Sequence, residues 1–203
     1  MLVPCSKCLL PPRNCVCAQL PCISLPFEII VIRHVQAAQK SSNTAFVASL
    51  CIPGMKIVDV AFPRDIPPDI MPKDGDILLF PPLEDASKYV RNEAPQRLFV
   101  LDGSWRQARK IYRQNVSFRK IPHLTLSPRE IPPPRILTPT LPDGMCTMEA
   151  ISRSLDYFGF EDEGELLHQA LCSFVEERRK VTGIRIPIPP GMSFSDVRKL
   201  GYG

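Results

Sequence analysis

Long hydrophobic runs are missing from this 203-residue chain, and no run approaches the roughly 20 apolar residues that cross a bilayer. Residues 1–5 show neither a basic n-region nor a long apolar stretch, so we expect no signal peptide and no membrane span. A strong charge imbalance is also missing, because the net charge is only +4. The expected location is therefore the cytosol or the nucleus, where cysteines serve as thiols or metal ligands rather than in disulfides.

The apolar pattern predicts an α/β fold without internal repeats. Patterns typical of buried strands lie at residues 27–32, 55–62, 76–80, 97–101 and 123–126. Patterns typical of helices lie at residues 36–51, 84–90, 104–115, 147–160 and 164–181. Strands that alternate with helices favour a largely parallel sheet with helices on both faces. We expect a small N-terminal zinc-binding appendage at residues 1–24, one catalytic domain at 25–182, and a Pro/Gly-rich tail at 183–203.

Four of the eight cysteines lie within residues 5–17. They form a CxxC pair, Cys5 and Cys8, and a CxC pair, Cys15 and Cys17. Two close pairs on a short loop can place four thiolates around one tetrahedral Zn²⁺. We predict a structural zinc site, because four thiolates leave no open position for catalysis. Four unrelated thiols, or a redox-active CxxC pair, are the alternatives.

The stretch at residues 101–110 reads LDGSWRQARK and holds the only tryptophan, Trp105. An apolar run precedes it, and Ser104 with Gln107 forms an S-x-x-Q capping box that begins a helix. Ligands bind parallel sheets beyond the carboxyl ends of the strands, which makes Asp102 a candidate catalytic carboxylate. A role as a turn residue is the alternative for Asp102, and a core position is the alternative for Trp105.

The helix that follows carries charge of one sign. Between residues 103 and 120 there are six basic residues and no acidic residue. At about 100° per residue, one face of the helix collects four of them. These are Arg106, Arg109, Lys110 and Arg113. The pattern indicates a surface that binds a phosphate backbone, with an ordinary solvated face as the alternative.

The same stretch is similar to the signature of DTW-domain proteins, in which Asp, Thr or Ser, and Trp open a helix that ends in Ala-Arg-Lys. Four other blocks of that family occur here in the expected order. They are the cysteine cluster, an H-P-x-E-x-x-(K/R)-x-x-N-T segment at residues 34–44, a Leu-aromatic-Pro turn with an acidic-Ala pair at 79–86, and an S-T-x-E-A segment at 146–150. The chain departs from the pattern at Val35 and Ala37, which replace Pro and Glu, and at Cys146, which replaces Ser.

The resemblance implies a tRNA-uridine aminocarboxypropyltransferase. Such an enzyme transfers the 3-amino-3-carboxypropyl group of S-adenosylmethionine to N3 of a uridine in tRNA and releases 5'-methylthioadenosine. The resemblance also implies a SPOUT-like catalytic domain with a C-terminal knot. Asp102 is then the expected general base, and Trp105 is expected to wall the pocket or to face the sulfonium.

Further site residues follow from the resemblance. Three turns would cradle the cofactor, through Leu79, Phe80 and Pro81, through Leu101, Gly103 and Ser104, and through Cys146, Thr147 and Glu149. The basic helix face would hold tRNA phosphates. Second candidates for the RNA or for the cofactor carboxylate are Lys40, Asn43 and Arg135. The implied ligands are S-adenosylmethionine, tRNA and structural Zn²⁺, and no obligate protein partner is evident.

Two alternatives remain at this point. An S-adenosylmethionine-dependent RNA methyltransferase would use the same cofactor and the same RNA, and only the position of the cofactor would decide which group moves. A non-catalytic, zinc-bearing RNA-binding module would need no base at Asp102.

Overall fold

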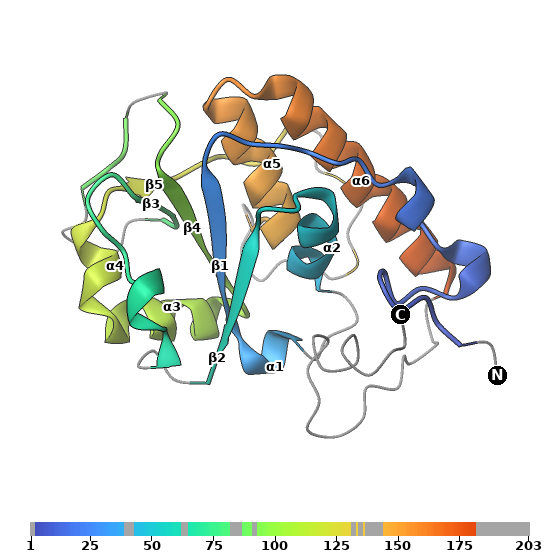
Figure 1. Ribbon diagram of the computed structural model, residues 1–203, viewed down its shortest axis with the longest axis horizontal. Coiled ribbons are helices and arrows are strands. Elements are labelled where there is room, and N and C mark those ends of the chain that lie inside the picture. The colour runs from blue at the N-terminus through green and yellow to red at the C-terminus, as the bar shows by residue number, and fades with distance from the viewer. Residues whose placement is uncertain are drawn as a thin grey trace.

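The core of the molecule is a five-stranded parallel sheet, as the sequence predicts (Figure 1). The computed structural model describes residues 3–38, 43–61, 65–81, 87–90, 93–130, 133, 136 and 144–181. The strands are β1 (Glu28–His34), β2 (Lys56–Val60), β3 (Ile77–Leu79), β4 (Arg97–Asp102) and β5 (His123–Leu124). Their order in the sheet is β2-β1-β4-β3-β5, and every neighbouring pair is parallel. The carboxyl ends of all five strands therefore lie at the same edge of the sheet.

Both faces of the sheet are buried. Figure 1 shows α2 (Thr44–Cys51), α5 (Thr147–Tyr157) and α6 (Glu161–Lys180) on one face, and α3 (Trp105–Gln114) and α4 (Val116–Lys120) on the other. Strand β1 shows why: Ile29 and Val31 enter the core under the first group of helices, and Ile30 and Ile32 enter the core under the second. Successive side chains of a strand point to opposite faces of the sheet, so a continuous apolar run contributes side chains to the hydrophobic cores on both faces.

One predicted helix is divided in two. The sequence predicts a single helix at residues 36–51, but the structure has α1 (Val35–Ala38) and α2. Between them Asn43 has an extended backbone, with φ −71° and ψ 101°. Its side chain accepts a hydrogen bond from the backbone N–H of Phe46 and so caps a new helix.

The helix predicted at residues 84–90 is wrong for residues 87–90. Lys88 instead forms a parallel bridge with His123. The backbone N–H of Tyr89 donates to the carbonyl of His123 at 2.7 Å, and the N–H of His123 donates to the carbonyl of Ser87 at 2.8 Å. The backbone groups of residues 87–89 therefore pair with the edge of β5. A helix of only one turn would leave most of its backbone N–H and C=O groups without a hydrogen-bond partner. Residues 84–86 lie outside the described residues.

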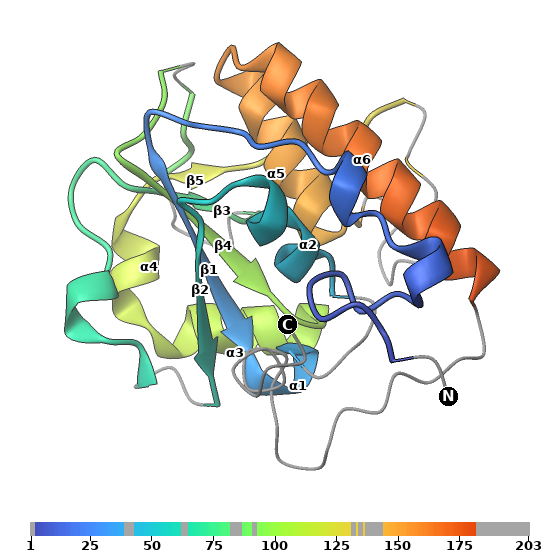
Figure 2. The ribbon, with the colours of Figure 1, turned by 45° about the vertical axis from the view of Figure 1, so that its right-hand side comes forward.

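The N-terminal segment packs against the last helix (Figure 2). The amide of Asn14 donates to Oε2 of Glu177 at 2.7 Å. Buried side chains of the segment, including Leu10, Val16 and Ile23, belong to the same core cluster as Phe174 of α6. The segment therefore shares the core of the sheet. The division at residues 24 and 182 stays a prediction, and residues 183–203 lie outside the described residues.

Helices α5 and α6 cross closely at Gly164. A Cβ at Gly164 would lie 2.1 Å from Oδ1 of Asp156 and 3.0 Å from the carbonyl oxygen of Ser152. The side chain of Asp156 is held in place by two ion pairs. Its Oδ2 lies 2.7 Å from Nη1 of Arg153 and 3.1 Å from Nη2 of Arg129.

Gly164→Ala is expected to lower the free energy of unfolding by about 1–3 kcal/mol, as overpacking in a core does. Thermal or urea unfolding measures the effect. The matched control is Gly54→Ala, because a Cβ there meets nothing within 4 Å. Its effect is expected to stay within about 0.5 kcal/mol. Equal effects of the two changes would contradict the close crossing.

Candidate functional site

Asp102 lies where the carboxyl end of β4 meets the first residues of two helices. Its Oδ1 accepts a hydrogen bond from the hydroxyl of Thr147, the first residue of α5. Its Oδ2 accepts from the side-chain amide of Asn43, the cap of α2, at 3.2 Å. Helix α3 begins soon after Asp102, at Trp105. Helix N-termini present free N–H groups and partial positive charge, so this edge suits a negatively charged group.

The pKa of Asp102 is raised above its usual value. Burial is the largest cause, because it disfavours the charged carboxylate, and the negative charge of Asp59 adds to it. The Thr147 hydroxyl, the Arg33 guanidinium and the Asn43 amide act in the opposite direction. A carboxylate with a raised pKa is a stronger base than an ordinary aspartate.

Asp102 belongs to a row of three charged residues across neighbouring strands. Arg33 is level with Asp59 of β2 and with Asp102 of β4. Residues level with one another on adjacent parallel strands point to the same face of the sheet. We call Asp59, Arg33 and Asp102 the edge row. Sequence reasoning did not assign Arg33 or Asp59 to the site, although a charged residue directly after the apolar run Ile29–Ile32 was the available signal.

Trp105 stands in a stack of aromatic rings. The rings of Trp105 and Phe80 are stacked with centroids 5.2 Å apart, and Phe80 stacks on Tyr112 at 5.3 Å. The guanidinium of Arg109 lies 6.0 Å from the centroid of Trp105. Trp105 is half-buried. Because Phe80 covers one face of the indole, the geometry suits a pocket wall better than an open platform.

The turn after Asp102 is closely fitted. The hydroxyl of Ser104 accepts from the N–H of Gln107, and the side chain of Gln107 accepts from the N–H of Ser104 at 2.8 Å. The capping box predicted from the sequence is therefore present. Gly103 has φ +155°, and a Cβ there would lie 3.1 Å from Cβ of Gln107. The turn needs glycine because a side chain would press on the capping residue.

The other predicted cofactor residues lie around the same edge. Leu79 ends β3, Phe80 and Leu101 are buried, and Pro81 is exposed. Glu149 is buried in the first turn of α5, and its carboxylate accepts from the N–H of Cys146 at 3.3 Å. This contact is that of a helix cap, so the carboxylate holds the start of α5. Lys40 and Arg135 lie outside the described residues.

The basic face of α3 is exposed as the helical period predicts. Arg106, Lys110 and Arg113 are exposed, whereas Arg109 is half-buried beside Trp105. The opposite face of α3 buries Ala108, Ile111 and Tyr112. Arg119 and Lys120, which are also exposed, extend the positive surface at the end of α4. The surface starts close to Asp102, since α3 begins there.

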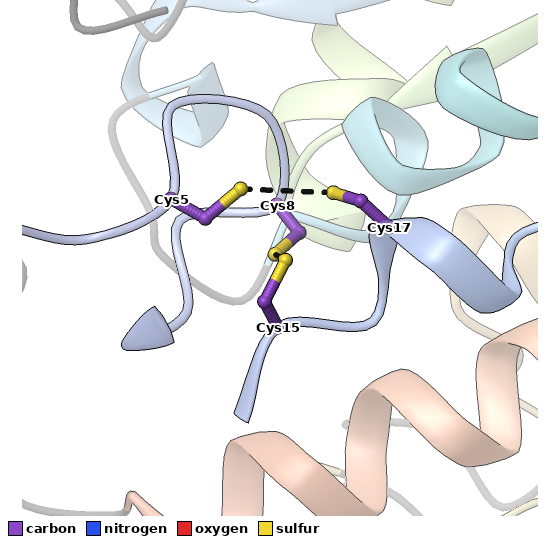
Figure 3. A group of neighbouring side chains, drawn as sticks. All are labelled: Cys5, Cys8, Cys15 and Cys17. Carbon is purple, nitrogen blue, oxygen red and sulfur yellow. Dashed lines mark hydrogen bonds between the residues drawn. The ribbon is translucent and has the colours of Figure 1, made fainter. Parts of the chain in front are cut away.

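The four N-terminal cysteines come together as the sequence predicts (Figure 3). Their sulfur atoms all lie within 4.8 Å of one another. The sulfur of Cys5 is 3.7 Å from that of Cys17, and the sulfur of Cys8 is 3.6 Å from that of Cys15. Four sulfurs at about 2.3 Å from a tetrahedral ion would be about 3.8 Å apart. The cluster therefore fits a tetrahedral metal ion.

The thiols ionise unequally without a cation. Burial and the nearby thiols raise the pKa of Cys8 to about 11. Burial, together with the negative charge of Cys8, raises the pKa of Cys17 well above its usual range. Burial also disfavours the charged form of Cys5, but hydrogen bonds from the backbone of Cys8 and Lys7 outweigh it and lower the pKa to about 7. A coordinated cation would deprotonate the other thiols outright.

No helix in the described parts of the chain has both the length and the apolar character to cross a membrane. The fold and the site define an α/β protein with a candidate ligand site at the carboxyl edge of a parallel sheet and a cluster of four cysteines that could hold a metal ion. Residues 3–179 match the model of the DTW domain, and the chain therefore belongs to the DTW-domain family.

One relative is tRNA-uridine aminocarboxypropyltransferase 2 of Macaca fascicularis. It is 26% identical to this chain over 127 residues. The match covers 57% of this chain and 43% of the relative, so it spans less than half of the relative's length. No solved structure matches the chain.

Proposed function

We propose that the chain transfers the 3-amino-3-carboxypropyl group of S-adenosylmethionine to N3 of a uridine in tRNA. The family and the name of the relative support the reaction type. The observation that carries the proposal is the placement of Asp102, with a raised pKa, between the helix starts at Asn43 and Thr147 and close to the basic face of α3. The SPOUT relation and the C-terminal knot remain predictions.

Asp102 would act as the general base. It would take the N3 proton of uridine, and the N3 electron pair would then form a bond to the γ-carbon of the methionine moiety. The bond from that carbon to the sulfonium would break, and its electrons would stay on sulfur to leave neutral methylthioadenosine. General bases contribute about 10²–10⁴-fold in rate. The aromatic wall of Trp105 and Phe80 would help to bring the γ-carbon, rather than the methyl group, to the nucleophile.

The basic face of α3 would hold the tRNA backbone. The double variant Arg106→Gln/Arg113→Gln is expected to weaken tRNA binding and to reduce its salt dependence, by roughly one unit in log K against log salt for each phosphate that the protein no longer neutralises. Filter binding at several salt concentrations measures this slope. The matched control is Lys73→Gln/Lys180→Gln, which removes the same charge from exposed residues before β3 and at the end of α6. Equal reductions of the slope would show that only net charge matters.

The cysteine cluster would hold Zn²⁺. Four thiolates in tetrahedral geometry suit zinc or an iron–sulfur centre, and the loop around Cys5, Cys8, Cys15 and Cys17 has the spacing of a small structural zinc site. The ion would tie the N-terminal segment to the core near α6, and it would leave no position open for substrate.

Label transfer tests the proposal. Purified protein is incubated with unmodified tRNA and S-adenosylmethionine labelled either in the carboxyl group or in the methyl group. Carboxyl label in the RNA supports the proposed transfer. Methyl label alone would identify a methyltransferase, and no label from either form would indicate an RNA-binding module.

A further inference from the structure

Arg33 is a buried cation at the carboxyl edge of the sheet. The residue is only 2% exposed. Its Nε donates to Oδ1 of Asp59 at 2.6 Å, and its Nη2 donates to Oδ2 at 2.8 Å. This bidentate pair fixes the plane of the guanidinium. It leaves Nη1 on the edge of the guanidinium that faces away from Asp59.

The pair stands directly beside Asp102. Arg33 is level with Asp102 on one side and with Asp59 on the other, so the edge row alternates negative, positive and negative. Nη1 of Arg33 is buried and has no hydrogen-bond partner among the described residues. A buried charge interacts more strongly with its neighbours than an exposed charge does, because water screens it less.

The two members of the pair act on Asp102 in opposite directions. Arg33 lowers the pKa of Asp102, and Asp59 raises it. The surrounding elements carry further ionisable groups, which are Glu28 and His34 of β1, Lys56 of β2, Arg97 of β4, the arginines, Lys110 and Tyr112 of α3, and Glu149, Arg153, Asp156 and Tyr157 of α5. Helices α1 and α2 contain no ionisable side chain other than the thiol of Cys51. The edge row is therefore the only part of β1 and β2 that brings fixed charge level with Asp102.

We propose that Arg33, held in place by Asp59, is a positioning residue that keeps Asp102 as a carboxylate ready to accept a proton. The inference rests on the proposed function, because it takes Asp102 as the base of the transfer. Removing Arg33 leaves Asp102 facing a second carboxylate. Removing the charge of Asp59 frees Arg33 and also removes a like charge. The two changes therefore act oppositely on the base, although both break the same ion pair.

The test is the pH dependence of kcat/KM for label transfer. The acid limb is the fall of kcat/KM at low pH. In Arg33→Gln the midpoint of this limb is expected to shift to higher pH by about one unit, and in Asp59→Asn it is expected to shift to lower pH. Arg33→Lys keeps the cation and is expected to return the limb toward that of the parent protein. The matched control is Glu28→Gln, which breaks the exposed ion pair of Glu28 and Lys56 between the same two strands and should leave the limb in place.

A purely structural ion pair would give a different result. Both variants would then lose activity with no shift, or with a shift in the same direction, and that would overturn the inference. Carbon NMR titration of the Asp102 carboxyl group gives the same comparison without activity. It decides the inference even if the parent protein transfers no label, an outcome that would contradict the proposed function alone. If Arg33→Gln does not fold, the inference is decided by whether the acid limb of Asp59→Asn shifts to lower pH.

Discussion

Asp102→Asn is expected to reduce aminocarboxypropyl transfer by about 10²–10⁴-fold while the protein stays folded. The amide has nearly the same shape as the carboxylate. Its oxygen can accept from the side-chain amide of Asn43, and its NH2 group can donate to the hydroxyl of Thr147, but it cannot take a proton. Label transfer to tRNA under single-turnover conditions measures the loss. The matched control is Asp74→Asn, for which transfer should be unchanged, because this exposed aspartate precedes the amino end of β3 whereas the site lies at the carboxyl ends of the strands.

The same variant is expected to be more stable at neutral pH. The folded-state pKa of Asp102 is raised, so the folded protein binds this proton more tightly than the unfolded chain does. The stability from this group is full below the unfolded pKa and is lost as the pH rises through the folded pKa. Neutral pH lies above the pKa of an aspartate in the unfolded chain, so this stability is reduced there, and Asp102→Asn should raise the melting temperature. A lower melting temperature with full transfer would contradict both roles of Asp102.

Cys8→Ser is expected to abolish the proposed metal binding and to destabilise the N-terminal segment. Cys8 is the buried member of the four and belongs to the main core cluster. Zinc sites of this kind contribute about 10–16 kcal/mol of apparent binding free energy in small peptides at neutral pH, so losing one thiolate should cost the segment several kcal/mol. Metal analysis of the purified protein and thermal unfolding measure the two effects.

Cys22→Ser is the matched control for the cluster. Cys22 is exposed and lies five residues beyond the last cluster cysteine in the sequence. The variant should therefore keep one equivalent of metal and the melting temperature of the parent protein. Metal loss in Cys22→Ser, or full metal content in Cys8→Ser, would contradict the four-cysteine site.

The strands and the cysteine site were predictable because each depends on a local pattern. The apolar run at Ile29–Ile32 is typical of a strand covered on both faces, and two close cysteine pairs separated by six residues can meet on a short loop. The capping box at Ser104 was predictable for the same reason. The helix predicted at residues 36–51 was harder to divide correctly, because alanine-containing stretches lie on both sides of Asn43, which caps the second helix.

The edge row was not predictable from spacing. Arg33, Asp59 and Asp102 lie far apart in the chain, and only the register of three parallel strands makes them neighbours. A shift of one residue in either pairing would turn a charged side chain to the opposite face. The partners of Asp102 were likewise hidden, since Asn43 and Thr147 are 59 and 45 residues away in sequence.

The hydrogen bond between Asn14 and Glu177 joins residues 163 positions apart. A ribosome that adds about 5–20 residues per second releases the cysteine segment roughly ten to thirty seconds before the surface of α6 that receives it. During that interval the thiols are open to oxidation and to competing metals. Early capture of a metal ion would protect them, so the order of synthesis favours loading the cluster before the domain closes.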